Sequence, residues 1–340
     1  MTKDQHITED YALYNSDCMY VLPTLPDKSI DLSIYSPPFC GLYNYSSSEN
    51  DFSNCATREE FLEQYRHLVE QMGRVIKPGR ICAVHCQDII IDTTAHKLYD
   101  FPNDIIKLHL ENGFHFMNRI TVWKEPLQVR IRTMVKSLTH RMIIEDSTRS
   151  FPAAPDYVLI FKKAGENEVP VTHPEGLKRY AGAHPMLPEM ERKYGPWEHI
   201  KAKYAEWKDH RTNKLSHIIW QRYASSVWDD IRNNHVLEFK DGREEDDEKH
   251  VHPLQLDVID RLVDLYSNPG ETVLTPFMGV GSEVYGPVSM GRKAIGIELK
   301  ESYYKQAIRN LATVYSRFVG EREAQLFDEL AQEDAEEVEL

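Results

Sequence analysis

A serine and two prolines directly after a short apolar stretch form the first pattern in this chain that could do chemistry. Residues 31–35 have the composition of a buried strand, and Ser36-Pro37-Pro38-Phe39 follows at once. The prolines fix the backbone, so the Pro37 carbonyl and the Ser36 hydroxyl can both accept hydrogen bonds from one planar amino group, while Phe39 stacks on its ring. Two hydrogen bonds of this kind would orient the lone pair of the amino nitrogen toward an electrophile. The plain alternative is a stiff turn after a strand.

A second pattern, far downstream, has the features of a nucleoside-binding site. Gly279 and Gly281 follow an apolar segment at 271–277, and Glu298 closes the next expected strand at 293–298. Glycines let the backbone approach a ligand closely, and a carboxylate at the end of the second strand can accept hydrogen bonds from both ribose hydroxyls. A third glycine in dinucleotide spacing and a Gly-Lys-Ser/Thr motif are both missing, which disfavours a phosphate-rich ligand. The alternative is a glycine turn that binds nothing.

The composition predicts a globular, reduced and non-exported protein. A chain of 340 residues with 41% hydrophobic content can bury a full core. It shows no apolar run of membrane-spanning length and no export signal at its start. The five cysteines are an odd number without a paired framework, which is typical of reduced thiols in a cytoplasm.

The net charge of −14 is concentrated in two segments. Nine acids and one base from residue 321 onward carry −8, and six acids with two bases at 241–249 carry −4, so the rest of the chain is nearly neutral. Such runs are typical of solvated, flexible segments, and a tail that recruits a partner is the alternative.

A basic stretch at 126–144 contains no acid. Its charged residues are Arg130, Arg132, Lys136 and Arg141. A surface of this kind can contact phosphates, each contact adding about 0.9 to the salt slope on duplex DNA, or it can be an ordinary basic face.

The elements that must position these residues alternate between strand and helix, the pattern of a mostly parallel sheet covered on both faces. Thr57 and Glu60 form a capping box for a helix that should end before Pro78. Its apolar face is expected to consist of Phe61, Tyr65, Leu68, Met72 and Val75. Further strands are expected at 80–86, 116–123, 156–162, 271–277 and 293–298, and helices at 103–111, 253–266 (with Pro253 in the first turn), 282–290 and 302–315.

Cys82 and Cys86, with His85 between them, could suggest a zinc site. On a strand the two cysteines point to one face and His85 to the other, so the three cannot easily share an ion. We therefore predict buried thiols and no metal.

In this order, the patterns resemble the β-class DNA amino-methyltransferases, which modify cytosine N4 or adenine N6 with S-adenosylmethionine. In that class, as here, the catalytic tetrapeptide precedes the cofactor loop. Residues 15–31, 248–255 and 291–298 resemble the opening segment, the motif before the cofactor loop and the ribose-binding strand of the class. The resemblance covers residues 11–163 and 248–315.

The resemblance implies an α/β fold: a Rossmann-like methyltransferase sheet with helices on both faces, a permuted motif order and an inserted recognition region. Residues 11–163 would form the catalytic half, 164–235 the target-recognition region, 236–318 the cofactor-binding half of the same domain, and 319–340 a flexible acidic tail. The recognition region has weak apolar periodicity, so we expect no further sheet in it. Its aromatic residues are expected to be mostly core, with a minority on DNA: Tyr180, Tyr194, Trp197, Tyr204, Trp207 and Trp220.

The resemblance also implies S-adenosylmethionine as cofactor, double-stranded DNA as partner and a flipped base at Ser36, Pro37, Pro38 and Phe39. Residues at the cofactor would be Asp17, Cys18, His252, Pro253, Thr275, Phe277, Gly279, Gly281, Ser282 and Glu298. Phosphates would meet the four basic residues of 126–144. A homodimer and a cognate restriction enzyme are further partners that the family allows, in the cytoplasm of a bacterium or a phage-infected host.

Two positions bear on the choice among functions. Ser36 resembles the cytosine-N4 members, so we favour cytosine N4, with adenine N6 as the alternative. Thr275 stands where the class usually has Asp, which motivates a second hypothesis, a catalytically silent DNA-binding protein. A nicotinamide oxidoreductase would use the glycine turn but leave Ser36–Phe39 unexplained.

Overall fold

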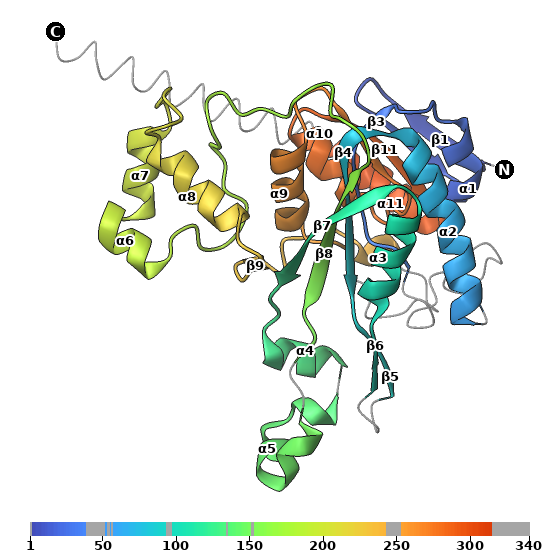
Figure 1. Cartoon of the computed structure of the whole chain (residues 1–340), viewed down its shortest axis with the longest axis horizontal. Coiled ribbons are helices and arrows are strands. Elements are labelled where there is room, and N and C mark those ends of the chain that lie inside the picture. Colours follow the sequence, from blue (N-terminus) through green and yellow to red (C-terminus); the bar gives the residue numbers. More distant parts are fainter. Residues whose placement is uncertain are drawn as a thin grey trace.

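A nine-stranded sheet forms the centre of the molecule, in the order β1-β2-β11-β10-β3-β4-β8-β7-β9 (Figure 1). The computed structural model describes residues 2–38, 52, 55, 57–92, 97–133, 135–150, 153–242 and 253–314. The strands are β1 (Asp4–Ile7), β2 (Tyr11–Asn15), β3 (Ile30–Tyr35), β4 (Ile76–Gln87), β7 (Phe114–Val122), β8 (Asp156–Lys163), β9 (Val227–Trp228), β10 (Thr272–Thr275) and β11 (Lys293–Glu298). Strands β2, β11, β10, β3 and β4 run parallel, and β8 lies antiparallel between β4 and β7.

Helices cover both faces of this sheet, which confirms the predicted α/β class. One face packs against α1 (Cys18–Val21), α2 (Arg58–Val75) and α3 (Phe101–Glu111), and the other against α9 (Leu256–Tyr266), α10 (Ser282–Ser289) and α11 (Glu301–Ala312). Because side chains alternate along each strand, neighbouring residues enter different cores. Tyr35 enters the α2–α3 core, whereas Ile34 enters the α9–α11 core.

Helix α2 follows the sequence prediction closely. The Glu60 N–H donates to the Thr57 hydroxyl over 3.1 Å, which caps the helix start. The predicted apolar face is fully buried, and the helix ends at Val75, before Pro78. The next strand begins at Ile76 rather than at 80, because Ile76 already pairs with Ile30 of β3.

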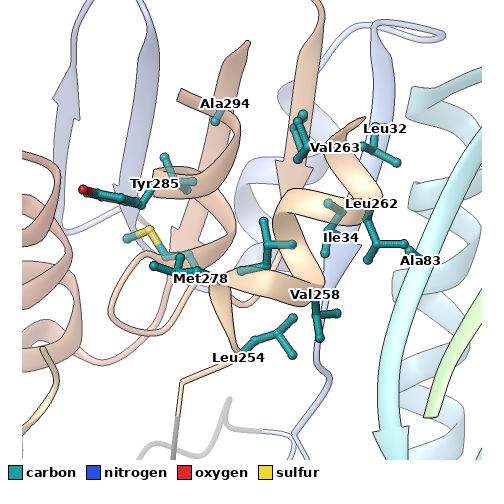
Figure 2. Close-up of a cluster of buried hydrophobic side chains, with 14 of the residues drawn as sticks. Leu32, Ile34, Ala83, Leu254, Val258, Leu262, Val263, Met278, Tyr285 and Ala294 are labelled. Carbon is teal, nitrogen blue, oxygen red and sulfur yellow. The ribbon is translucent and has the colours of Figure 1, made fainter. Parts of the chain in front are cut away.

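Helix α9 lies across the sheet beside β3 and β4, with Val258 and Leu262 near Ile34 and Ala83 (Figure 2). It begins at Leu256, so the prediction that Pro253 lies in its first turn is wrong. Its N-cap residue is Gln255, and Asp257 in its first turn binds Arg232 and His235 from the preceding segment.

Residues 164–235 form a small lobe beside α9, with α6 (Pro188–Tyr194), α7 (Trp197–Tyr204) and α8 (Lys214–Tyr223) (Figure 1). Of the six aromatic residues named in the sequence analysis, four pack against the core of this lobe, whereas Trp207 and Trp220 are exposed. The expectation of no further sheet is wrong at Val227–Trp228, because β9 pairs with β7 at the sheet edge.

Arg261 joins this lobe to α9, which packs on the sheet. The fully buried guanidinium donates to Asp230 over 2.8 Å and to the Ala181 carbonyl over 2.7 Å. Its charge also lies near the rings of Tyr180, Tyr223 and Trp228. The lobe is therefore held by a buried, paired charge.

The basic stretch is helical and extends beyond the ends of β7 and β8 as α4 (Pro126–Thr133) and α5 (His140–Asp146) (Figure 1). A two-stranded sheet of β5 (Ile89–Asp92) and β6 (Lys97–Tyr99) leaves the main sheet after β4. Short 3-10 turns complete the described elements: η1 (Leu22–Thr24), η3 (Lys136–Leu138), η4 (Ser147–Arg149) and η5 (Lys240–Gly242).

Candidate active site

The carboxyl ends of five parallel strands meet at one edge of the sheet. Along this edge β2 and β11 pair up to Asn15 and Glu298, and β3 and β4 pair up to Tyr35 and Val84. Strand β10 lies between β11 and β3. Open α/β sheets bind ligands outside these strand ends. The fold therefore brings the segment after β3 and the glycine loop after β10, which lie far apart in sequence, to neighbouring positions.

The glycine loop is held against the end of β11 by Glu298. The Gly279 N–H donates to one Glu298 carboxylate oxygen over 2.9 Å, and the Lys300 N–H donates to the other over 2.8 Å. Gly279 and Gly281 have φ of +52° and +95°, a region that side chains rarely adopt, which explains why both are glycines. A carboxylate oxygen has two lone pairs, so it can accept a hydrogen bond from a ligand hydroxyl in addition to one from a backbone N–H.

Two buried hydroxyls flank this loop without hydrogen-bond partners in the described part of the chain. Thr275, at the end of β10, and Ser282, at the start of α10, are almost fully buried. Buried polar groups are normally paired, so two orphaned hydroxyls beside a glycine loop fit a bound polar ligand. Burial also raises the pKa of the next residue, Glu283, to about 8, and the Glu298 carboxylate adds to the shift. Glu283 was not predicted from the sequence, although it is an acidic residue in the first turn of α10, directly after Ser282.

The remaining predicted cofactor residues lie around the same edge where the structure describes them. Asp17 follows β2 and accepts the Met19 N–H over 2.8 Å as the cap of α1. Burial raises the pKa of the adjacent Cys18 thiol well above its usual value, with Asp17 adding to the shift. Phe277 packs 5.9 Å from the Tyr35 ring. Pro253 is half-buried, whereas His252 and Phe39 lie outside the described residues.

A hydrogen-bonded series of side chains begins at Ser36, and we call it the edge network: Ser36, His85, Asp156 and Lys124. Ser36 Oγ lies 3.2 Å from His85 Nδ1, and His85 Nε2 lies 3.0 Å from Asp156 Oδ2. Lys124 Nζ reaches the same carboxylate oxygen over 2.6 Å. Sequence reasoning considered His85 only as a zinc ligand and missed Asp156 and Lys124, because the contacts span sheet neighbours and no local motif announces them.

The charges within the edge network keep Asp156 ionised. Burial alone would raise the pKa of Asp156, but the charges and hydrogen bonds of Lys124 and His85 outweigh burial and hold this pKa well below its usual range. Asp156 is therefore a carboxylate in the folded protein. Such a group can orient a histidine and stabilise it if it becomes protonated.

Comparison with known proteins identifies the family. A family model for N6 and N4 methyltransferases, described as DNA methylase, matches residues 30–309. The chain belongs to this DNA methylase family. Type II methyltransferase M.BglII of Bacillus subtilis is 25% identical over 319 residues, which cover 91% of this chain and 70% of that protein. The DNA adenine methyltransferase YhdJ of Escherichia coli K12 is 21% identical over 308 residues, covering 89% and 83%.

Solved structures share the fold of this DNA methylase. The PvuII DNA methyltransferase, which is cytosine-N4-specific, superposes with a TM-score of 0.57 at 14% identity, covering 94% of this chain and 97% of that one. The protein TTHA0409 of Thermus thermophilus, complexed with S-adenosyl-L-methionine, gives a TM-score of 0.57 at 20% identity, covering 90% and 95%. The resemblance inferred from the sequence is thus confirmed at the level of family and fold.

S-adenosylmethionine is the cofactor of the family, and the residues at the strand edge fit it. A glycine loop, the Glu298 carboxylate and two orphaned hydroxyls offer close backbone approach and polar partners to a nucleoside.

Cys82 and Cys86 of the methylase lie in the α2–α3 core, on the face opposite His85, as strand alternation predicts. Burial raises the pKa of the Cys82 thiol to about 12 and that of Cys86 well above its usual value. Both are therefore thiols rather than metal-binding thiolates at neutral pH.

The predicted phosphate-binding residues lie on the α4–α5 extension at the same end of the sheet. Lys136 and Arg141 are exposed, and Arg130 is half-buried, while the side chain of Arg132 is not described. Arg141 pairs with Glu145, an acid just beyond the basic stretch, so its charge is partly neutralised. Apolar side chains share the exposed surface of this extension: Leu127, Ile131, Ile143 and Ile144.

In the described part of the methylase, no helix combines the length and the apolar character needed to cross a membrane.

Proposed function

We propose that this DNA methylase transfers a methyl group from S-adenosylmethionine to the exocyclic amino group of a base turned out of duplex DNA, with cytosine N4 as the favoured target. One observation carries the proposal. The Ser36 hydroxyl, hydrogen-bonded to His85, projects from the same strand edge that holds the glycine loop and Glu298. An amino-group acceptor and a nucleoside site at adjacent strand ends provide the two halves of a methyl transfer to nitrogen.

At the cofactor, Glu298 would accept the ribose hydroxyls, and Asp17 at the neighbouring strand end would contact the adenine. The Gly279–Gly281 backbone and Phe277 would lie against the nucleoside, and Thr275 and Ser282 would find their missing partners on it. Cys18, His252 and Pro253 complete the proposed cofactor residues.

At the target base, Ser36 Oγ and the Pro37 carbonyl would accept the two amino protons, and Phe39 would stack on the ring. Bound S-adenosylmethionine supplies an electrophilic methyl group on a sulfonium sulfur. Two acceptors on one amino group orient its lone pair away from the ring plane, and orientation of this kind supplies much of the rate. Pro37 and Pro38 keep the acceptors in place, since their φ angles are fixed.

Substrate DNA would contact the lobe at 164–235 as target-recognition region and the basic residues Arg130, Arg132, Lys136 and Arg141 through its phosphates. The halves 11–163 and 236–318, in permuted order, would then form one catalytic domain, with 319–340 as a flexible tail. Turning a base out of the duplex costs a few kcal/mol, which contacts of this kind must offset. A homodimer and a cognate restriction enzyme belong to the same proposal.

The choice of base has support on each side. Ser36 resembles the cytosine-N4 members, and a cytosine-N4-specific enzyme shares the fold. The similarity to an adenine methyltransferase favours adenine N6 as the alternative. Either amino group can donate to the same acceptors, so the side chains alone favour neither.

Mass spectrometry of nucleosides tests the proposal directly. Plasmid DNA would be grown with this protein in a host that lacks its own amino-methylation. N4-methylcytosine is the expected product, and N6-methyladenine would keep the mechanism but overturn the choice of base. If neither mark forms while titration calorimetry detects S-adenosylmethionine binding, DNA is not the substrate. Failure to bind the cofactor would favour the catalytically silent DNA-binding protein.

Ser36→Ala tests the assigned acceptor. We expect kcat to fall about 100-fold, the usual effect of removing one transition-state hydrogen bond, with cofactor affinity nearly unchanged. The matched control is Ser29→Ala, before the other end of β3, where the hydroxyl donates to the Pro26 carbonyl. Joint loss of cofactor binding and activity in Ser36→Ala would instead give Ser36 a structural role.

A further inference from the structure

The edge network takes one residue from each of four strands that are neighbours in the sheet. Ser36 follows β3, His85 lies in β4, Asp156 begins β8, and Lys124 follows β7. In the sheet register Tyr35 pairs with Val84, and Asp156 pairs with both Gln87 and Val122. Strand alternation then directs all four side chains to the α9 face at the carboxyl edge of β3, β4 and β7. The series is thus a product of the sheet order.

The charged end of the network determines where its protons lie. Lys124 and Asp156 are buried together at 2.6 Å, and Asp156 is ionised. A carboxylate only accepts hydrogen bonds, so His85 Nε2, 3.0 Å away, carries a proton and donates it to Asp156. In the neutral form of His85, Nδ1 carries no proton and accepts the Ser36 hydroxyl proton over 3.2 Å.

A Ser36 hydroxyl that donates to His85 presents only lone pairs to the active site. A serine hydroxyl has one proton, and here that proton is already engaged. An unconstrained hydroxyl could instead turn its proton toward the lone pair of the target nitrogen, which would block attack on the methyl group. The network therefore removes the unproductive orientation of Ser36.

We propose that His85 is a positioning residue for methyl transfer: it keeps the Ser36 hydroxyl an acceptor for the target amino group and takes up the proton that this group releases. The proposal rests on the proposed function. As the nitrogen–methyl bond forms, the methyl–sulfur bond breaks and its electron pair stays on sulfur, leaving a positive charge on nitrogen. The nitrogen then gives a proton to Ser36 Oγ while the original Ser36 proton moves to His85 Nδ1. Asp156 stabilises the resulting imidazolium until the proton passes to solvent.

Protonation of His85 before methyl transfer would have the opposite effect on the orientation of the Ser36 hydroxyl. With both ring nitrogens protonated, Nδ1–H would donate to Ser36 Oγ and turn the serine proton toward the target nitrogen. Among the described residues, His85 forms hydrogen bonds with Ser36 on one side and Asp156 on the other, and Lys124 lies behind Asp156. Protonation of His85 would therefore lower kcat, and a variant without an ionisable side chain at this position measures the share of the pH dependence that comes from His85.

Two substitutions of His85 separate positioning from packing. His85→Leu removes the acceptor, and we expect kcat to fall about 100-fold, the usual contribution of a positioned proton acceptor. His85→Asn places an amide oxygen near the position of Nδ1 and cannot be protonated. This variant keeps Ser36 an acceptor but takes up no proton, so its kcat should lie between those of His85→Leu and the wild type, and it should lack the part of the acidic decline of kcat that comes from His85. Both variants should keep the KM for DNA and the affinity for S-adenosylmethionine within a factor of about three.

The assay uses the full chain with plasmid DNA, labelled S-adenosylmethionine and pH values from 5 to 8. His115→Leu is the matched control, because His115 is an exposed histidine toward the opposite end of β7 in the same sheet. It should leave kcat and its pH profile unchanged.

Three outcomes would overturn the inference. Wild-type kcat in His85→Leu would show that Ser36 needs no positioning. An unchanged acidic decline in His85→Asn would assign that decline to another group. Equal losses of cofactor affinity in both His85 variants would make the residue structural. If the wild-type protein itself methylates no DNA while binding the cofactor, the proposed function fails first, an outcome distinct from these three.

Discussion

Two histidines contact adjacent residues at the end of β3, on opposite faces of the sheet, and the two histidines differ in the charge of their surroundings. On the α9 face, Ser36 contacts His85, which leads to the ion pair of Asp156 and Lys124. On the α2–α3 face lies what we call the core network: Tyr35, Tyr65 and His109. Tyr35 Oη lies 2.8 Å from Tyr65 Oη and 3.3 Å from His109 Nε2. His109 Nδ1 donates to the Ile105 carbonyl over 2.8 Å.

The core network is neutral and closed. Burial lowers the pKa of His109 to about 4 and raises the pKa values of Tyr35 and Tyr65 well above their usual range. The His109 ring also stacks on Phe161 at 4.0 Å. The partners of His109 in the described part of the chain are uncharged, so His109 stabilises the fold but does not take up a proton near neutral pH. In the edge network the Asp156 carboxylate can stabilise a protonated His85. The ion pair therefore distinguishes His85, which is suited to proton transfer, from His109, which is structural.

Asp156→Asn should have the largest effect, because it removes the charge that distinguishes the two networks. Lys124 would remain buried without an ionised partner, which typically costs about 3–5 kcal/mol in the free energy of unfolding. Activity should fall as well, since the amide no longer stabilises protonated His85. Urea unfolding at pH 7 and single-turnover methylation measure the two effects.

The double variant Asp156→Asn, Lys124→Met separates stability from activity. Removing both charges should recover most of the lost free energy of unfolding, while kcat stays low because His85 still lacks its carboxylate. Recovery of kcat together with stability would mean that the ion pair only supports the fold.

His109→Gln tests the neutral character of the core network through pH. Unfolded histidine binds a proton near pH 6.5, whereas folded His109 does so only near 4, so the unfolded state binds more protons between these values. Stability from neutral His109 is therefore full above pH 6.5 and is lost as pH falls toward 4. Between pH 7 and 5 the wild type should lose about 2 kcal/mol more than His109→Gln in urea unfolding.

The exposed His67 provides the control, because its ring lies at the surface of α2 between Glu63 and Glu70. His67→Gln gives the effect of removing an exposed histidine, against which the pH dependence of His109→Gln is compared. Equal pH dependence in wild type and His109→Gln would instead show that His109 is protonated inside the fold.

Local segments of this protein could be predicted from the sequence. The unit from β10 to Glu298 spans fewer than 30 residues, and its strand, glycine turn, helix and terminal acid lie in the predicted order. Helix α2 was predicted with its cap and its buried face because both depend on spacing within one turn or two. The family followed from such local motifs in a particular order.

Contacts set by the sheet order could not be predicted in the same way. The residues of the edge network are separated by 32 to 49 positions in the sequence, from Ser36 to His85, His85 to Lys124 and Lys124 to Asp156. They meet because β8 inserts between β4 and β7, an order that periodicity does not encode. Strand β9 was missed for the same reason, since two residues carry no alternation pattern and their pairing partner lies more than 100 positions away.

Tyr35→Phe should have the smallest effect and the sharpest contrast, because Tyr35 precedes Ser36 directly. Losing the hydroxyl leaves Tyr65 Oη and His109 Nε2 short of one hydrogen-bond partner, which should lower the free energy of unfolding by about 1–2 kcal/mol. The kcat for methyl transfer should stay within about two-fold of the wild type, against the roughly 100-fold loss expected for Ser36→Ala. Parallel measurements of urea unfolding and kcat on both variants decide the matter. A loss of activity in Tyr35→Phe as large as that in Ser36→Ala would mean that both the core network and the edge network support methyl transfer. The ion pair would then not distinguish a structural network from a catalytic one.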